Sequence, residues 1–226
     1  WKTRAGLFSK FYQINFPAIL GRDGSGTVTE IADDVSSFKV GDEVCFMMPR
    51  GEGCYAEEIV IPEEFAVLKP INISFSEAAS YPLVAVTSWM AFEDKYTGGL
   101  RDKHLLIHGG AGGIGSVAIP IAKYLGAFVS TTCSSSNVNY VTSLGADKVI
   151  AYDKKNFVNE LEDVDIVYDT MGGNVHRLSY DVIKPGGYIS CLNALPFEDL
   201  SESHNVSVNI VQVDNIHDPL VQVSNL

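Results

Sequence analysis

The spacing of hydrophobic and polar positions changes character near residue 75. Before that point, short apolar stretches alternate with polar residues and are separated by glycine-rich turns, a pattern typical of β-strands. We predict a strand over 27–31 after the turn at 21–26, a turn followed by a strand over 39–46, and a further strand over 56–61. The first third of the chain is therefore expected to be rich in β-structure.

Between residues 74 and 92 the apolar positions follow a helical period, and Pro82 is expected to divide this stretch into two short helices. Beyond residue 103, apolar strands alternate with helices. The predicted strands cover 104–108, 128–132, 149–152, 165–169, 188–192 and 206–213. The predicted helices cover 114–125, 138–144, 157–161 and 175–183. Such alternation predicts an α/β fold, a doubly wound parallel sheet covered on both faces.

A glycine-rich run lies between the first of these strands and its helix. Residues 110–115 read GAGGIG, so Gly110, Gly112 and Gly115 satisfy the pattern G-x-G-x-x-G. The first glycine allows a tight turn, the second lets a pyrophosphate approach the backbone, and the third lets the helix pack on the strand. The pattern alone is weak, but its position between strand and helix indicates a Rossmann dinucleotide site. The alternative is a plain strand–helix turn.

The end of the next strand indicates which nucleotide is preferred. An NAD site usually carries an acidic residue there to bind the ribose hydroxyls. Residues 131–137 read TTCSSSN, which includes no acid, and serines 134–136 offer hydroxyls to a 2′-phosphate. No Arg or Lys lies in this stretch, so the prediction of NADPH rests on neutral donors; the alternative is a polar loop without nucleotide contact.

Composition and charge narrow the function classes. The 226 residues carry a net charge of −12, which disfavours a nucleic-acid partner because the phosphate backbone would be repelled. No apolar run approaches the ~20 residues needed to cross a bilayer, so no membrane partner is expected. The four cysteines, Cys45, Cys54, Cys133 and Cys191, show no metal-binding spacing. We expect free thiols in a reducing compartment and a cytoplasmic location.

Several spaced motifs together resemble the medium-chain dehydrogenase/reductase superfamily. Beside the glycine run, they are FPAILGRDGSG at 16–26, FKVGDEV at 38–44, LGAD at 144–147 and KPGG at 184–187. The branch most similar is the zinc-independent quinone oxidoreductases, which include zeta-crystallin. Zinc alcohol dehydrogenases carry a His-Glu pair where this chain has Arg22 and Asp23, and they carry a four-cysteine lobe that it lacks. We therefore expect no metal, and interpret Arg22 and Asp23 as an ion pair.

The resemblance implies two domains. Residues 1–75 are expected to form part of a β-rich, GroES-like substrate domain, and residues 76–226 the Rossmann domain. Because members of the family extend further in both directions, we expect the chain to be truncated or incompletely recorded at both ends. Part of the substrate pocket then lies outside this sequence.

The resemblance also implies which residues contact the cofactor. They lie in the glycine turn, at strand ends and in the preceding helix: Thr87, Gly110, Ala111, Gly112, Gly113, Ile114, Cys133, Ser134, Tyr152, Leu192 and Asn193. Two candidates for a catalytic role are Thr87, near the nicotinamide, and Lys2, which falls where relatives place a tyrosine. The alternatives are a threonine bonded to its own helix, an exposed lysine at a frayed end, and, for Tyr152, a solvated strand-end hydroxyl.

The function implied is an NADPH-dependent reductase of quinones or α,β-unsaturated carbonyls, acting by hydride transfer. An enoyl-thioester reductase shares the architecture, and a non-enzymatic NADPH-binding protein is a third possibility because folds do not fix functions. No side chain is an obvious essential acid, and His104, His108 and His176 are interpreted as structural. An edge strand at 206–213 is the candidate surface for a homodimer, in which it would pair with its copy to extend the sheet.

Overall fold

The computed structural model describes residues 3–6, 15–93, 98–192, 198–213 and 215–226. It contains two compact units, Trp1–Leu83 and Val84–Ser224, each described here by itself. Lys2 and Asn193, both predicted site residues, lie outside the described residues. The domain boundary expected at residue 75 stays a prediction.

The first unit contains a three-stranded antiparallel sheet of β1 (Asp23–Thr27), β2 (Glu43–Met47) and β3 (Ala66–Leu68), in the order β1-β2-β3. Gly24 lies opposite Phe46, and a Cβ at Gly24 would overlap the Phe46 ring. The glycine-rich residues therefore form the strand themselves, because only glycine leaves room for that ring. The prediction of a turn at 21–26 followed by a strand at 27–31 was wrong, because the strand already begins at Asp23 and ends at Thr27.

The strand predicted at 56–61 was also wrong, because these residues adopt bends and irregular backbone. Ile59 and Ile61 nevertheless pack against the small core of this unit. Their apolar character therefore indicated burial, although these residues do not form a strand. The strand that does form, β3, was not predicted. It follows a 3-10 turn at Glu63–Phe65 and has only three residues, which is too short for a period to be visible.

The stretch divides into two helices, as predicted, and the second begins at Pro82. Helix α1 (Phe75–Ala78) begins with a capping box, in which the Ser74 hydroxyl accepts the Glu77 N–H and the Glu77 carboxylate accepts the Ser74 N–H. Helix α2 (Pro82–Ala91) opens on the proline, whose missing N–H costs nothing in a first helical turn. Asp23 accepts the Leu83 N–H at 2.9 Å, which satisfies one of the unpaired donors of that turn.

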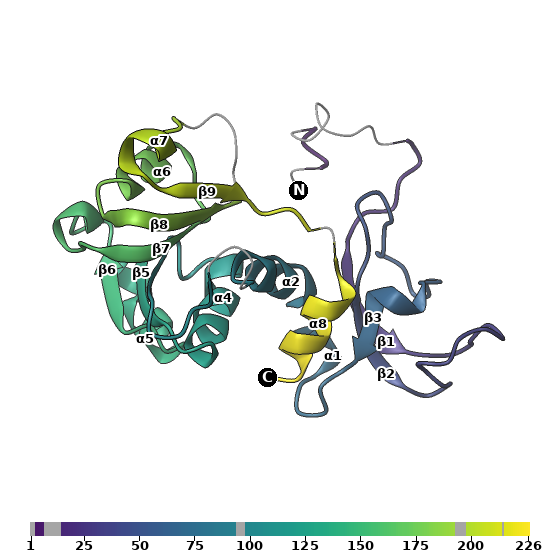
Figure 1. Ribbon diagram of the computed structural model, residues 1–226. Coiled ribbons are helices and arrows are strands. Elements are labelled where there is room, and N and C mark those ends of the chain that lie inside the picture. The colour runs from purple at the N-terminus through teal and green to yellow at the C-terminus, as the bar shows by residue number, and fades with distance from the viewer. Residues whose placement is uncertain (1–2, 7–14, 94–97, 193–197, 214) are drawn as a thin grey trace. The chain divides into compact units, whose positions relative to one another are not determined.

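The second unit is built on a six-stranded sheet in which all pairs are parallel, with the order β6-β5-β4-β7-β8-β9 (Figure 1). Its strands are β4 (His104–Ile107), β5 (Phe128–Cys133), β6 (Lys148–Ala151), β7 (Val164–Asp169), β8 (Ile183–Cys191) and β9 (Ser207–Ile210). Its helices are α4 (Gly113–Tyr124), α5 (Val138–Ser143), α6 (Gly173–Ser179), α7 (Ser201–His204) and α8 (His217–Ser224). The doubly wound α/β prediction is confirmed.

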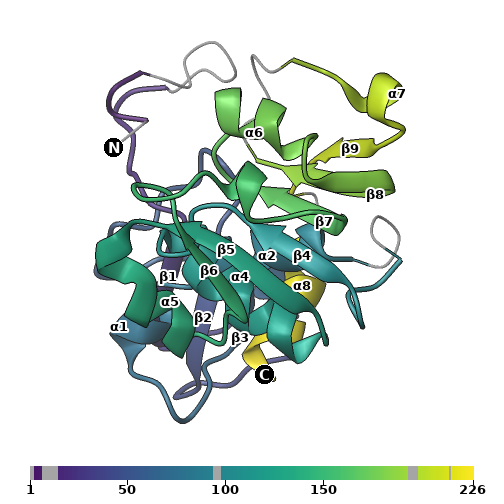
Figure 2. The same ribbon diagram turned by 90° about the vertical axis from the view of Figure 1, so that its left-hand side faces the viewer.

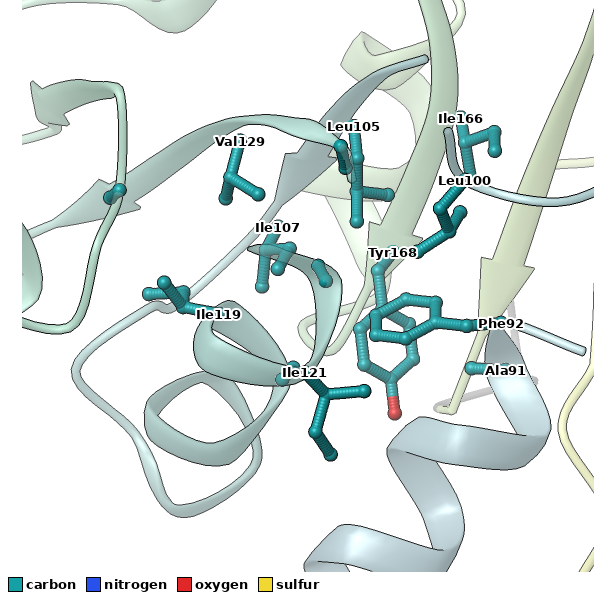
Figure 3. Close-up of a cluster of buried hydrophobic side chains, with 14 of the residues drawn as sticks. Ala91, Phe92, Leu100, Leu105, Ile107, Ile119, Ile121, Val129, Ile166 and Tyr168 are labelled. Atoms are coloured by element: carbon teal, nitrogen blue, oxygen red, sulfur yellow. The ribbon is translucent and has the colours of Figure 1, made fainter. Parts of the chain in front are cut away.

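Two hydrophobic clusters cover the two faces of this sheet. On one face, α2, α4 and α5 pack on Leu105, Ile107 and Val129, and the Tyr168 ring meets Phe92 edge-on at 5.1 Å (Figure 3). The turned view shows α4 and α5 beside β5 and β6 (Figure 2). On the other face, α6 and the 3-10 turn Phe157–Asn159 cover a second cluster. Both faces are buried, as continuous apolar strands require.

Three details differ from the predictions. The helix expected over 175–183 ends at Ser179, because Ile183 already pairs with Val164 as the first residue of β8. Residues 157–161 contain only one 3-10 turn, at Phe157–Asn159. The last predicted strand is shorter than expected, at Ser207–Ile210, and it lies at one edge of the sheet formed by the described strands.

Candidate cofactor-binding site

The sheet of the second unit has a topological switch point at β4. From this strand the chain runs outward to β5 and β6 on one side, then returns to form β7, β8 and β9 on the other. Ligands of open α/β sheets bind outside the carboxyl ends of the strands at such a point. A pocket of about 590 Å³ lies there, lined by residues that follow β4, β6 and β7 and by Thr132 within β5. Its lining includes His108, Gly109, Thr132, Tyr152 and Met171.

The turn after β4 is held closely against β5. The Gly110 N–H donates to the Thr132 carbonyl at 2.9 Å, and the Gly109 N–H donates to the Thr132 hydroxyl at 3.1 Å. A Cβ at Gly110 would overlap the Thr131 hydroxyl, and one at Gly115 would overlap the Gly109 carbonyl and lie 2.5 Å from the Gly110 Cα. The first and third glycines of the motif are thus required by the protein's own packing.

Gly112 is different. It precedes α4 as its N-cap with φ −81° and ψ 172°, a backbone conformation that any residue adopts. A Cβ there would meet one close protein atom, the Gly109 oxygen at 3.2 Å. This contact is tight, but a Cβ at Gly112 is less crowded by protein atoms than one at Gly110 or Gly115. The space beside Gly112 fits a group that approaches the backbone closely, as the pyrophosphate of a dinucleotide does.

The amino end of α4 supplies the matching electrostatics. Gly112 has no side chain to cap the helix, so the N–H groups of the first turn, including those of Gly113 and Ile114, have no acceptor within the helix. Together with the helix dipole, these donors favour an anion. The residues present fit a dinucleotide: Gly110 to Ile114 would hold its pyrophosphate.

The loop after β5 contacts an acidic residue that belongs to another part of the chain. Ser134 and Ser136 share a hydrogen bond between their hydroxyls at 2.9 Å. The N–H and hydroxyl of Ser135 both donate to the carboxylate of Asp153, at 2.7 and 2.6 Å. Residues 131–137 themselves contain no acid, as the sequence shows, but Asp153 reaches the serines from the neighbouring strand β6, two residues after its end.

Lysines also line the pocket, although residues 131–137 contain none. Lys154 and Lys155 follow Asp153 and both border the pocket. Lys155 pairs with Glu160 at 3.1 Å. Tyr152 lies on the same rim with 63% of its surface exposed, and its N–H donates to the Cys133 carbonyl at 3.0 Å. The parallel pairing of β5 with β6 brings these residues to the same edge of the sheet, and no local pattern in the sequence predicts this contact.

Two buried histidines brace the loops beneath the pocket. His108 lies with its ring nitrogens 3.3 Å from the Thr132 hydroxyl and 3.0 Å from the Ser179 hydroxyl, and burial lowers its pKa to about 4. His176 pairs with Asp169 at 2.8 Å. Burial raises the pKa of Asp169, but hydrogen bonds from His176 and two backbone N–H groups outweigh it and the net shift is downward. Both rings are buried and hydrogen-bonded within the fold, and their structural role stays a prediction.

The remaining predicted site residues occupy several positions around the carboxyl edge. Cys133 ends β5 and is buried, and Ser134 follows it directly. Leu192 follows β8, with its N–H on the Asp169 carbonyl at 3.0 Å. Thr87 lies in α2 and is 8% exposed. Their contacts with a cofactor stay predictions.

In the first unit, Arg22 and Asp23 are tied to the backbone. The Arg22 Nε donates to the Met48 carbonyl at 2.8 Å. Burial raises the pKa of Asp23 to about 6, against the Leu83 N–H and the charge of Arg22, which lower it. In the described part of the chain, no three His, Cys, Asp or Glu side chains are grouped to bind a metal. No helix among these residues has the length and apolar character to span a membrane.

Two family models match this chain. Residues 1–71 match the alcohol dehydrogenase GroES-like domain, and residues 113–213 match the zinc-binding dehydrogenase model. The chain belongs to the medium-chain dehydrogenase/reductase superfamily. The GroES-like assignment of the first part is thereby confirmed, as is the superfamily inferred from the motifs.

Curated relatives carry oxidoreductase names. The chain is 40% identical over 179 residues to the zebrafish (Danio rerio) "NAD(P)H oxidoreductase RTN4IP1, mitochondrial", covering 75% of this chain and 46% of the relative. It is 35% identical over 201 residues to the "2-methylene-furan-3-one reductase" of Solanum lycopersicum, covering 85% and 50%. The chain thus spans about half the length of the curated relatives it matches.

Solved structures share the fold. The quinone oxidoreductase from Coxiella burnetii is 30% identical with a TM-score of 0.85, covering 100% of this chain and 73% of that one. The Escherichia coli quinone oxidoreductase complexed with NADPH is 25% identical with a TM-score of 0.85, covering 99% and 72%. The CurK enoyl reductase has the same identity and TM-score, covering 99% and 73%.

Proposed function

We propose that this chain is part of an NADPH-dependent, zinc-independent reductase of quinones or α,β-unsaturated carbonyls. The observation that carries the proposal is Gly112, where space for a close approach to the backbone coincides with the uncapped amino end of α4. The names of the relatives support an NAD(P)H-linked reduction, and the NADPH complex of a similar fold supports the phosphorylated cofactor.

The described residues have mainly a positioning role in this reaction. Gly110 to Ile114 bind the pyrophosphate, and Ser134 and Tyr152 lie at the edge of the sheet proposed for the adenosine ribose. When bound, the nicotinamide supplies the hydride. Thr87 in α2 is proposed to face the nicotinamide half, and holding two reactants in line accounts for much of such catalysis. Lys2, proposed to donate to the developing oxygen anion, and Asn193 stay predictions from the resemblance.

A test is nucleotide binding followed by turnover. We expect NADPH to quench the protein's tryptophan fluorescence and to be oxidised in the presence of 1,2-naphthoquinone or an enone. Binding without turnover of either class would contradict the reductase and support a non-enzymatic NADPH-binding protein. The cytoplasmic location and the homodimer through β9 are proposals that this assay leaves aside.

An enoyl-thioester reductase is the second candidate, and the similarity to the CurK enoyl reductase favours it. The same assay with crotonyl-coenzyme A separates the two. Faster turnover of the thioester than of the free enone and quinone would select this candidate. The net charge of −12 disfavours it, because a phosphopantetheine arm is anionic.

A further inference from the structure

The contact between the loops after β5 and β6 gives Asp153 a fixed place in the site. Cys133 and Ala151 are partners in the parallel ladder, so the residues that follow them emerge side by side at the carboxyl edge. Each oxygen of the Asp153 carboxylate accepts one hydrogen bond from Ser135, at 2.7 Å from its N–H and 2.6 Å from its hydroxyl. The two bonds fix both the position and the rotation of the carboxylate.

This carboxylate is charged at neutral pH. The hydrogen bonds from the Ser135 side chain and backbone lower the pKa of Asp153 below its ordinary value. Charge-assisted hydrogen bonds of this kind are the stronger ones, so the negative charge is firmly held among the serines. Asp153 also lines the 590 Å³ pocket, whose rim therefore carries the charge.

Lys154 acts in the opposite direction. It borders the same pocket, and its charge is near enough to contribute to the lowered pKa of Asp153. The neighbouring Lys155 is engaged with Glu160 at 3.1 Å. The ribose end of the site thus combines one fixed carboxylate with one nearby ammonium group, and a 2′-phosphate would meet both.

We propose that Asp153 is a specificity-determining residue for the cofactor, because its carboxylate in the serine loop weakens binding of nucleotides with a 2′-phosphate relative to those with a free ribose diol. The inference rests on the proposed function, since it requires the adenosine ribose to lie against Ser134 to Ser136. In many Rossmann sites an acid at the end of the second strand binds the diol. Here the third strand, β6, supplies it.

The test isolates the contribution of the 2′-phosphate to the binding affinity. Isothermal titration calorimetry gives the Kd of 2′,5′-ADP and of 5′-AMP for wild type and Asp153→Asn, in the full chain. We expect the substitution to lower the Kd of 2′,5′-ADP about tenfold, or ~1.4 kcal/mol, and to change that of 5′-AMP less than twofold. Asparagine keeps an acceptor for Ser135, and Asp153→Ser serves as a second variant in which a hydroxyl takes that place.

Asp163→Asn is the matched control. Asp163 precedes β7, at the amino end of the strands, and its φ of 53° suits asparagine. It removes the same charge from the same unit, so an equal effect on 2′,5′-ADP would show a general charge effect and overturn the proposal. An unchanged ratio of the two Kd values in both Asp153 variants would also overturn it.

Turnover measured in parallel separates the two proposals. If the ratio shifts as expected but neither quinone nor enone is reduced, the specificity role stands and the reductase fails. If wild type reduces a quinone or enone with NADPH and the ratio ignores Asp153, only the specificity role fails. If the folded protein binds neither 2′,5′-ADP nor 5′-AMP, both are overturned.

Discussion

At the scale of single residues, the three motif glycines have different physical reasons to be glycine. Gly110 and Gly115 are crowded by the protein itself, since a Cβ at either would overlap neighbouring atoms. Gly112 has an ordinary φ and one near neighbour, the Gly109 oxygen at 3.2 Å, and we propose that a ligand is the further reason for glycine there. Substitutions at these positions should therefore separate stability from binding.

We expect Gly112→Val to weaken NADPH binding at least tenfold, ~1.4 kcal/mol, because the side chain occupies the space proposed for the pyrophosphate. Fluorescence titration measures the affinity, and the thermal midpoint verifies that the variant is folded. Gly112→Ala is a milder second variant with a smaller loss in the same direction. An affinity equal to wild type in folded Gly112→Val would refute the pyrophosphate assignment.

Gly115→Ala should show the opposite balance. Its Cβ would overlap the backbone of Gly109 and Gly110, where no side chain can move aside, so the turn must shift away from α4. We expect an overpacking penalty of roughly 1–3 kcal/mol in the free energy of unfolding, measured with urea. A variant as stable as wild type would mean that the helix and turn are less closely packed than described.

At the scale of elements, periodicity identified the six strands of the second unit and the helices after β4, β5 and β7. It failed in β1, where glycines stand at strand positions and no apolar period is visible, and in β3, which has only three residues. The glycine turn was visible in the sequence because its residues are contiguous. Asp153 was not, because its contact with Ser135 depends on the register of β5 with β6, which no local pattern encodes.

The serine loop should respond to a new charge. We expect wild type to prefer NADPH over NADH by something like tenfold to a hundredfold, since neutral and charge-assisted hydrogen bonds contribute roughly 1–3 kcal/mol. Ser134→Asp should reverse that order, because a second carboxylate beside Asp153 repels the 2′-phosphate and accepts from a diol. The measurement is kcat/KM for both cofactors in the two proteins, with Ser143→Asp, in α5, as the charge control. A ratio that ignores Ser134→Asp would remove the loop from cofactor selection.

His108, directly after β4, contacts Thr132 in β5 and Ser179 in α6, and its protonation should lower the free energy of unfolding. Its pKa falls from 6.5 to about 4 on folding because burial disfavours the charged ring. The stabilisation is fully present above pH 6.5 and is lost as the pH falls toward 4, by on the order of 3 kcal/mol. We expect His108→Gln, which keeps hydrogen-bonding groups but does not titrate, to flatten this part of the pH profile of unfolding. A profile parallel to wild type would assign the acid sensitivity to other groups.

At the scale of the whole molecule, the side chains present indicate whether the proposed reductase activity needs a metal ion. The four cysteines are buried as free thiols, and the described residues gather no three metal-ligating side chains. We therefore expect reductase activity to survive prolonged treatment with a strong chelator, measured with NADPH and 1,2-naphthoquinone. Loss on chelation and recovery with zinc, but not magnesium, would reveal a metal site and contradict the zinc-independent assignment.

The order of strands in the sheet also has a consequence for synthesis on the ribosome. β4 is one of the two central strands, yet its neighbour β7 follows it by 61 residues, as the pairing of Leu105 with Ile166 shows. At 5–20 residues per second, that distance takes roughly 3–12 s to translate. During this interval the apolar run Leu105–Ile107 can pair with β5 but leaves its other edge open. We therefore expect the nascent chain to expose an unpaired hydrophobic edge for seconds, and such edges are prone to aggregation until they are paired or covered.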